Sequence, residues 1–208
     1  MLHCTIYDVA DLPPWEEPTR KQTMTTIAPR ADIPLQGVIR LLRHSELPQF
    51  KAHLLRLDVE SRRDRFNGPA NDAFVSAYAE KCFRNGAVVI GYVENGKVLG
   101  AAELHEQVTQ AEPTGEIAFS VEPHMQQRGL GGLLFSRLIE SARAFGYERL
   151  RVTTHPQNGT MKRLAMRFNA TLRFEDGETV GMIGLAPMPP LPLRPGAGAF
   201  VPLEAGAF

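Results

Sequence analysis

A glycine-rich segment in the middle of the chain has the residue types needed to hold an anion. It reads Gln126-Gln127-Arg128-Gly129-Leu130-Gly131-Gly132 and leads directly into the apolar-periodic stretch Leu130 to Phe145. Glycine tolerates positive φ and lets backbone amides approach a ligand closely. The first amides of a helix have no internal partner and lie at the positive end of its dipole. The segment therefore predicts a phosphate cradle at the start of a helix.

Single residues exclude two well-known phosphate motifs. A nucleotide-triphosphate loop ends in Gly-Lys-Ser/Thr, whereas Gly131 is followed here by Gly132 and Leu133. A dinucleotide fingerprint that began at Gly129 would require glycine or alanine at position 134, which is Leu134. Neither motif is present.

The spacing Gln126-x-x-Gly129-x-Gly131 resembles the pyrophosphate signature of the GNAT superfamily of N-acetyltransferases, Gln/Arg-x-x-Gly-x-Gly/Ala. A predicted strand ending Val121-Glu122-Pro123 precedes it, and Asn158-Gly159-Thr160-Met161 resembles the start of the family's second helix on the CoA side. A weaker likeness, to the acetyltransferase domain of bacterial protein-lysine acetyltransferases, rests on Ser61-Arg62-Arg63-Asp64-Arg65-Phe66 and Gly115-Glu116-Ile117-Ala118. The resemblance covers roughly residues 37–186 and implies the acyl-CoA N-acyltransferase fold.

This resemblance implies acetyl-CoA as a cosubstrate, and no metal. In the family, two neighbouring parallel strands splay apart and the pantetheine arm of CoA pairs with backbone in the gap. Carried over, the arm would lie along Phe119, Ser120 and Val121, with Leu150 to Thr153 opposite. The remaining cofactor-binding residues would be Gln126, Gln127, Arg128, Gly129, Leu130, Gly131 and Gly132 at the pyrophosphate, and Asn158 on the other side.

Acyl transfer to an amine needs a base, because an amine with a pKa of about 10.4 is protonated at neutral pH. Glu116 is the preferred catalytic base. It starts the strand that would hold the acyl group, at the position where related lysine acetyltransferases carry a glutamate. Glu103, His105 and Glu106 end the neighbouring strand and stay open as alternatives.

The other groups around the thioester are less well defined by the sequence. A backbone N–H, of Ser120 or Val121, is expected to polarise the carbonyl. Many family members carry a tyrosine seven residues after the asparagine as general acid, and that position is Ala165 here. The thiolate would then leave unprotonated, since the pKa of a thiol is about 8.5, or take a proton from water. His124 is expected to be a loop residue and Glu122 to point away from the acyl site.

Hydrophobic periodicity predicts the elements that position these residues. The expected helices are Glu46 to Asp58, Asn71 to Phe83, Leu130 to Phe145 and Thr160 to Phe168. The expected strands are Gly37 to Leu42, Ala87 to Val93, Lys97 to Leu104, Glu116 to Val121 and Leu150 to Thr153, with a hairpin from Leu172 to Leu185. Asn95-Gly96 and Asp176-Gly177 are expected to be tight hairpin turns. We therefore predict an α+β domain, a mixed central sheet flanked by helices, over residues 37–186.

The two ends of the chain read differently from this domain. Residues 1–36 are proline-containing and lack periodicity, which predicts a loose leader, and Met24 is a plausible alternative start. Residues 187–208 carry six prolines and two Ala-Gly-Ala-Phe repeats, which predicts a disordered or surface-draped tail.

Composition limits the partners. Lys plus Arg and Asp plus Glu are equal at 23 each, so no general attraction to nucleic acid or anionic lipid is expected. Cys4 and Cys82 predict free thiols in a reducing cytoplasm. No apolar run approaches the roughly 20 residues of a membrane helix, and the first ten residues are not expected to form a secretion signal. The expected partner is an amine acceptor, small molecule or protein lysine, and the expected state is a monomer or homodimer.

Other functions remain open from the sequence. One keeps the fold but uses a longer acyl-CoA. Another is a catalytically inactive acyl-CoA-binding or sensing module, which the absence of the tyrosine at Ala165 would allow. The arginines Arg56, Arg62, Arg63 and Arg65 are expected to form a solvated, self-paired charged face, with a site for an acidic substrate group as the alternative.

Overall fold

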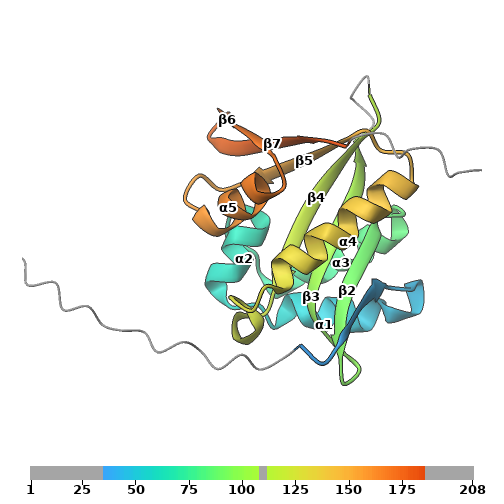
Figure 1. Cartoon of the computed structure of the whole chain (residues 1–208). Helices are drawn as coiled ribbons and strands as arrows, with labels where there is room; N and C mark the ends of the chain where they lie inside the picture. The colour runs from blue at the N-terminus through green and yellow to red at the C-terminus, as the bar shows by residue number, and fades with distance from the viewer. Residues whose placement is uncertain (1–34, 108–111, 186–208) are drawn as a thin grey trace, which may run out of the picture. The chain divides into compact units, whose positions relative to one another are not determined.

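The structure, a computed structural model of the 208-residue chain, describes residues 35–107 and 112–185. The predicted tail, and the predicted leader apart from Leu35 and Gln36, lie outside the described residues. Within them, seven strands form one mixed sheet in the order β1-β2-β3-β4-β5-β7-β6 (Figure 1). The strands are β1 (Val38–Leu41), β2 (Val88–Glu94), β3 (Lys97–Gln107), β4 (Thr114–Val121), β5 (Arg149–Thr154), β6 (Thr171–Glu175) and β7 (Glu178–Gly184).

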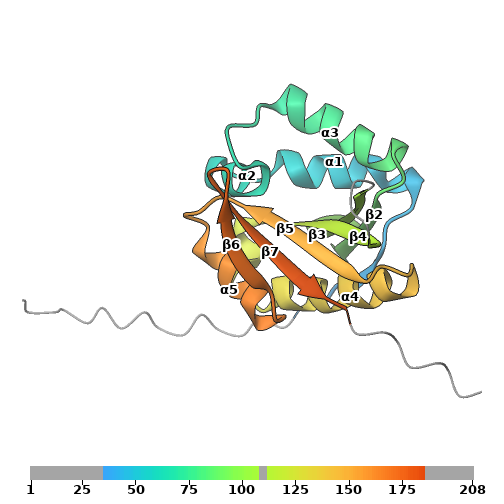
Figure 2. The same cartoon turned by 90° about the horizontal axis from the view of Figure 1, so that it is seen from above.

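Helices cover both faces of this sheet. They are α1 (Leu47–Leu55), α2 (Val59–Phe66), α3 (Asp72–Arg84), α4 (Leu130–Ala144) and α5 (Gly159–Arg167), with 3₁₀ turns η2 (His44–Glu46) and η3 (Pro123–Met125). The first three helices lie on one face and α4 and α5 on the other (Figure 2). Because successive strand residues point to opposite faces, Ala101 packs in the core beneath α1 and α3, and Ala102 in the core beneath α4. The predicted mixed sheet flanked by helices is confirmed.

The helix α2 was not predicted. The helix expected from Glu46 to Asp58 ends at Leu55, and Asp58 instead begins α2. The Ser61 amide donates to the Asp58 carboxylate (2.7 Å), which gives the first turn of α2 the partner that it lacks internally. The other predicted elements are present, with bounds shifted by three residues or fewer. None of the described helices is long and apolar enough to cross a membrane.

Both predicted hairpin turns are confirmed. Asn95 and Gly96 have φ of 51° and 73°, and Asp176 and Gly177 have φ of 49° and 85°. Positive φ at both central residues is the type I′ geometry, whose twist matches that of the flanking strands.

The feature that positions the candidate site is the parallel pair β4–β5. These two strands pair from Thr114–Arg149 to Ile117–Val152, although β4 continues to Val121 and β5 to Thr154. Along the rest of its described length, β4 pairs with β3 alone. The two strands therefore separate and leave a gap in the sheet.

Candidate active site

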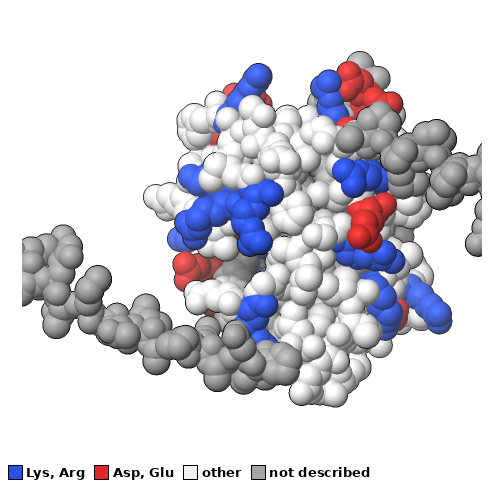
Figure 3. All heavy atoms as spheres, in the orientation of Figure 1, with Lys and Arg blue, Asp and Glu red and all other residues white. Residues whose placement is uncertain are grey.

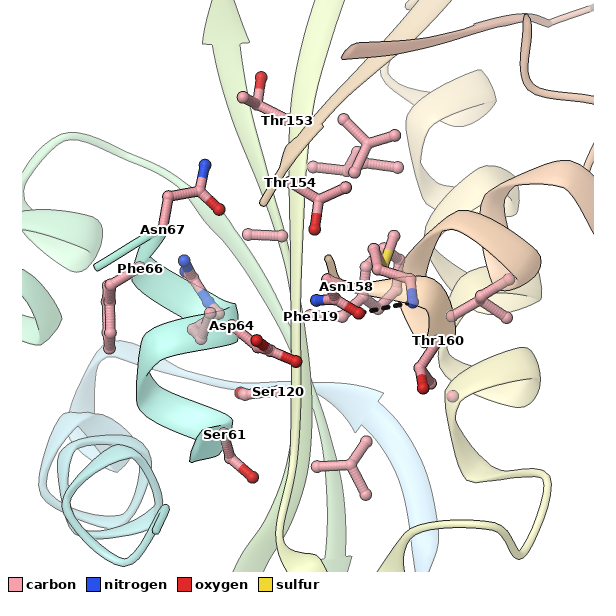
Figure 4. A pocket seen from close by; sticks show the side chains of 18 of the residues that line it. Ser61, Asp64, Phe66, Asn67, Phe119, Ser120, Thr153, Thr154, Asn158 and Thr160 are labelled. Atoms are coloured by element: carbon pink, nitrogen blue, oxygen red, sulfur yellow. Dashed lines mark hydrogen bonds between the residues drawn. The ribbon is translucent and has the colours of Figure 1, made fainter. Parts of the chain in front are cut away.

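The gap between β4 and β5 opens into a cavity of about 990 Å³. Its lining comes from α2 on one face of the sheet and from the start of α4 and from α5 on the other (Figure 4). The cavity thus continues through the sheet, and its volume is that of a site for a large organic ligand. The preferred base and every predicted cofactor-binding residue line this cavity except Arg128 and Gly132, and so does His105 of the alternative bases, whereas Glu103, Glu106 and Leu150 do not.

The β4 edge that faces the gap carries backbone groups at alternate residues. The Glu122 amide donates to the Leu99 carbonyl of β3 (3.0 Å). Since successive strand residues direct their N–H groups to opposite edges, the Ser120 N–H also faces β3. The N–H groups of Phe119 and Val121 face the gap. Of the two predicted oxyanion donors, the geometry therefore favours Val121 over Ser120.

Phe119 contributes to packing through its ring, in addition to the backbone N–H that faces the gap. Its ring stacks on Phe135 of α4 (centroids 4.8 Å apart), and Phe135 stacks on Phe168 at the end of α5 (4.2 Å). This column of three rings holds β4, α4 and α5 together directly beside the gap. Its position depends on contacts between three elements distant in the sequence.

The glycine-rich segment makes a sharp turn into α4. Gln127 and Gly129 have φ of 60° and 78°, a region that glycine adopts without strain. The Gly132 amide donates to the Gly129 carbonyl (3.0 Å), so this member of the predicted cradle is already bonded within the first turn. The amides of Leu130 and Gly131 begin the helix and lack intrahelical acceptors, as an anion site requires.

Gln126 links this segment to the gap. Its side-chain amide donates to the Val121 carbonyl (3.0 Å) and to Ser61 Oγ of α2 (3.2 Å). A ligand that paired with the β4 edge would take over the Val121 carbonyl, so Gln126 occupies a position that ligand binding would change.

The surface beside the cradle is basic. Lys and Arg side chains gather over α5, as Figure 3 shows, and the basic residues of that helix are Lys162, Arg163 and Arg167. Asn158 caps α5, with its Oδ1 accepting from the Met161 amide (2.9 Å), and its side-chain NH₂ remains as a donor. Positive charge next to free helix amides suits a ligand with several phosphates.

Glu116 lies on the cavity wall at the paired end of the gap. Its carboxylate accepts from Arg151 Nη1 (3.3 Å), from Thr153 Oγ1 (3.2 Å) and from the Gln107 side chain. Its side chain is 29% exposed, so it is held in place yet accessible. His105 is its cross-strand neighbour on β3 and also lines the cavity.

Glu103, one of the alternative bases named from the sequence, is already paired with other side chains. It is fully buried and accepts from Arg65 Nη2 (2.7 Å) and from the Tyr78 hydroxyl (2.6 Å). Burial alone would raise the pKa of Glu103, but the Arg65 charge and the hydrogen bond with His105 hold that pKa well below its usual range. A carboxylate that stays ionised as the counterion of Arg65 cannot accept a proton from an amine. The pairing with Arg65 and Tyr78 therefore disfavours Glu103 as the base.

Glu106, another of the alternative bases, lies on the opposite face of β3 from Glu103. On that face, burial and the Glu106 charge raise the pKa of Tyr147.

Cys82, Glu103 and His105 offer ligand atoms within 4.8 Å of one another, as a metal site would require. Arg65 already neutralises that carboxylate, and burial raises the pKa of the Cys82 thiol to about 12, so this group suits a cation poorly.

The four arginines predicted as a solvated face are held by separate acidic partners. The pairs are Arg56–Glu122 (2.7 Å), Arg62–Asp72 (2.6 Å), Arg65–Glu103 (2.7 Å) and Arg63–Asp64 (3.7 Å). Pairing within residues 56–65 is found only for Arg63, because the other three arginines pair with acidic residues outside that segment. Arg62 and Arg65 are only 16% and 8% exposed and are not solvated. These pairs disfavour the alternative of an acidic-substrate site. Glu122 is not among the described residues that line the cavity, and His124 is 61% exposed in the turn η3.

Polar groups that α2 and β5 bring to the gap were not predicted from the sequence. Asp64 and Asn67 reach from α2 toward β4, and Thr154 projects from β5 (Figure 4). The Asn67 side-chain nitrogen donates to Glu178 (2.8 Å), but its buried Oδ1 has no partner among the described residues. The buried Thr154 Oγ1 is also unpartnered there. The cap signal at Asp58 could have revealed α2, whereas no local pattern marks Thr154.

Comparison with known proteins agrees with this geometry. Residues 55–170 match the model described as the acetyltransferase (GNAT) family. The GNAT domain of PAT from S. lividans is 21% identical, with a TM-score of 0.62, over 72% of this chain and 90% of that one. A ribosomal-protein-alanine N-acetyltransferase from Brucella melitensis is 17% identical, with a TM-score of 0.56, over 71% and 99%. A phosphinothricin acetyltransferase from Sinorhizobium meliloti, in complex with AcCoA, is 15% identical, with a TM-score of 0.55, over 76% and 96%. At these identities the likeness concerns the fold.

Proposed function

Because this chain belongs to the GNAT acetyltransferase family, we propose that it moves the acetyl group of acetyl-CoA to an amine by direct attack of the amine on the thioester. The observation that carries this proposal is the separation of β4 from β5 beyond Ile117–Val152. It leaves the Val121 N–H facing a cavity that both a thioester and an amine can enter. A backbone donor fixed in this way stabilises the oxyanion that forms during acyl transfer.

On the donor side, the α4 start and α5 supply the phosphate contacts. The Leu130 and Gly131 amides would receive the pyrophosphate, with the basic residues of α5 beside it. The pantetheine amides would pair with the β4 edge at Phe119 and at the Val121 carbonyl, and would displace the Gln126 side chain from that carbonyl. Thr154 Oγ1 supports this assignment, because a buried hydroxyl without a partner fits a ligand that supplies one.

On the acceptor side, the charge favours an amine that arrives as a cation. The carboxylates of Asp58, Glu60, Asp64, Glu116 and Glu178 line the cavity. Of the two arginines there, Arg65 is paired with Glu103 and Arg151 with Glu116. The unpartnered Asn67 Oδ1 can accept from an ammonium group, and the rings of Phe66 and Tyr78 can contact an aliphatic stem. A protein lysine and a small aliphatic amine both meet this description.

Glu116 would act as the base, through a water molecule, before the amine attacks. Its contacts with Arg151 and Thr153 hold the carboxylate at the cavity wall. Ala165, at the position of the family's tyrosine, is 1% exposed and has no hydroxyl. The thiolate of CoA would therefore leave with help from water or from the Thr154 hydroxyl.

Isothermal titration with acetyl-CoA, on the wild type and a Gly129→Asp/Gly131→Asp double variant, tests the donor site. A Cβ at Gly131 would meet Leu164 at 3.5 Å, an ordinary contact, so the loss of binding would come mainly from carboxylates placed in the cradle. The strained φ of 78° at Gly129 makes a check of the variant's fold by circular dichroism necessary. We expect the wild type to bind at roughly micromolar affinity and the folded variant to bind at least tenfold more weakly. Equal affinities would contradict the assignment of the cradle.

Glu116→Gln tests the base. It keeps the shape of the side chain and removes its proton affinity, so we expect kcat for transfer to a lysine peptide or a diamine to fall by about 100- to 10,000-fold. The affinity for acetyl-CoA should change by less than about threefold, because the carboxylate lies on the acceptor side. An unchanged kcat would exclude Glu116 and direct attention to its neighbour His105.

The absence of the tyrosine at Ala165 also favours a second candidate, an acyl-CoA-binding module without turnover. Tight binding of acetyl-CoA with no CoA release, with or without a panel of cationic amines, would support that candidate. Release of CoA would exclude it.

A further inference from the structure

Three buried side chains form a hydrogen-bonded chain that ends at the gap. Ser120 Oγ of β4 lies 2.9 Å from His53 Nε2 of α1, and His53 Nδ1 lies 3.1 Å from Glu122 Oε1. Their exposed fractions are 6%, 0% and 4%. Arg56 donates to the same carboxylate oxygen from Nε (3.0 Å) and Nη2 (2.7 Å). The proposed transfer to an amine uses none of these side chains.

The protonation states of this chain are fixed by its surroundings. Burial lowers the pKa of His53 in spite of the neighbouring Glu122, so the ring is neutral at pH 7. Burial alone would raise the pKa of Glu122, but its hydrogen bonds with His53 and Arg56 outweigh burial and lower it. A neutral imidazole has one N–H, and an ionised carboxylate can only accept. His53 Nδ1–H therefore donates a hydrogen bond to Glu122, and His53 Nε2 accepts a hydrogen bond from the Ser120 hydroxyl.

This is the arrangement by which a serine is activated as a nucleophile: a hydroxyl, an imidazole base and a carboxylate that orients the imidazole. In hydrolases that carry the serine at the end of a strand, the N–H of the following residue forms part of the oxyanion hole. The residue after Ser120 is Val121, whose N–H faces the gap. Ser120 also lines the cavity, so nucleophile and oxyanion donor meet at one place.

We propose that Ser120 is a nucleophile and that the protein hydrolyses short-chain acyl-CoA thioesters when no amine is bound. This activity rests on the proposed binding of the thioester in the gap. Ser120 Oγ attacks the thioester carbonyl while His53 Nε2 takes the hydroxyl proton. The C–S bond breaks, an ester of Ser120 forms, and His53 returns the proton to the thiolate to give CoA. Water then attacks the ester with His53 as base, which releases the carboxylic acid and restores Ser120.

The first experiment measures CoA released from acetyl-CoA in the absence of any amine. The wild type, Ser120→Ala and Ser136→Ala are compared by chromatography, which separates CoA from protein thiols. Ser136 is exposed on α4 and serves as the matched control. We expect the wild type and Ser136→Ala to release CoA well above the rate in buffer, and Ser120→Ala to lower that rate by at least about 100-fold.

The second experiment identifies the nucleophile by a covalent product. The reaction is quenched with acid within the first turnover, and peptides are analysed by mass spectrometry. We expect one acetyl group on the peptide that contains Ser120 in the wild type. Ser120→Cys, which keeps a nucleophile at the same place, should carry the acetyl group as a thioester.

These readouts separate a nucleophile from a residue that only holds α1 against β4. A purely structural Ser120 would lower stability when replaced, but neither the wild type nor Ser120→Cys would then carry an acetyl group at this position. Calorimetry on the wild type gives the other distinction. If acetyl-CoA binds but no CoA is released without an amine, the hydrolysis is overturned and the donor site stands. If acetyl-CoA does not bind, both are overturned.

Discussion

Two buried oxygen atoms at the gap, Thr154 Oγ1 and Asn67 Oδ1, have no hydrogen-bond partner in the described part of the chain. Leaving such an atom unpaired destabilises a folded protein, so each one indicates a place where a partner arrives from outside. Thr154 lies on β5 and Asn67 at the end of α2, on opposite sides of the cavity (Figure 4). Thr154 Oγ1 is placed to bond the proposed acyl donor, and Asn67 Oδ1 is placed to bond the proposed amine.

Thr154→Val separates binding from folding at this position. Valine has nearly the same shape and removes the unpaired hydroxyl, so the free energy of unfolding of the free protein should stay the same or rise. The affinity for acetyl-CoA should fall by about tenfold, since one hydrogen bond to the ligand is lost.

Calorimetry and urea denaturation on Thr154→Val, with Thr171→Val as an exposed control on β6, check both expectations. An unchanged affinity would mean that the hydroxyl does not contact the acyl donor.

At the level of elements, α2 is attached to the sheet by a buried ion pair. Arg65 binds Glu103 of β3 and Tyr78 of α3 through one guanidinium group, and its side chain also lies over the rings of Phe66 and Tyr78. Since α2 carries Asp64 and leads into Asn67, the position of the acceptor side depends on this attachment.

Arg65→Met should lower the free energy of unfolding by about 3–5 kcal/mol, because it leaves Glu103 buried without its cation. Arg65→Met/Glu103→Leu should recover most of that loss, since a buried apolar pair carries no unpaired charge. Lys51→Met breaks the exposed pair with Glu80 and should cost less than about 1 kcal/mol. Urea denaturation measures all three, and a double variant no more stable than Arg65→Met would argue against the charge as the cause.

The contact of α1 with β4 should make stability depend on pH. Burial lowers the pKa of His53, so the unfolded chain takes up a proton at this residue below about pH 6.5 and the folded chain does not. The contribution of neutral His53 to the free energy of unfolding is therefore complete above that pH and is lost as pH falls. The lowered pKa values of Glu103 and Glu122 add to the loss below about pH 4.3.

Unfolding curves at pH 8, 6 and 5 test this dependence. His53→Gln should be less stable than the wild type at pH 8 and should lose less stability between pH 6.5 and pH 5. His44→Gln, an exposed control, should follow the wild type. Parallel curves for wild type and His53→Gln would exclude His53 as the source.

For the molecule as a whole, the sequence predicted what depends on local pattern. The sheet strands, the hairpin turns at Asn95-Gly96 and Asp176-Gly177 and the helix after Gly129 each have a signature within a few residues. The proposed cradle also depends on a local pattern, the glycine-rich segment before α4. The acceptor side could not be predicted, because the pairing of Arg65 with Glu103 and of Glu122 with His53 joins residues far apart in the chain. Missing the break between α1 and α2 hid the helix that carries that side.

Among the described residues, those that line the cavity lie between Asp58 and Glu178. A chain of residues 35–185 should therefore fold cooperatively and bind acetyl-CoA within about threefold of the full-length affinity. Thermal unfolding and calorimetry on both chains check this. A large loss of affinity in the shorter chain would show that one of the ends contributes to the site.

The separation of β4 from β5 has a consequence for the traffic of reactants. The cavity is lined by α2 on one face of the sheet and by α4 and α5 on the other, so we expect reactants to enter it from both faces. In the proposed reaction, CoA can leave on the α4 and α5 face, where it entered, and the acylated amine can leave on the α2 face. The two products can then be released independently. An acceptor much larger than the cavity can present its amine on the α2 face while the acyl donor stays bound on the α4 and α5 face.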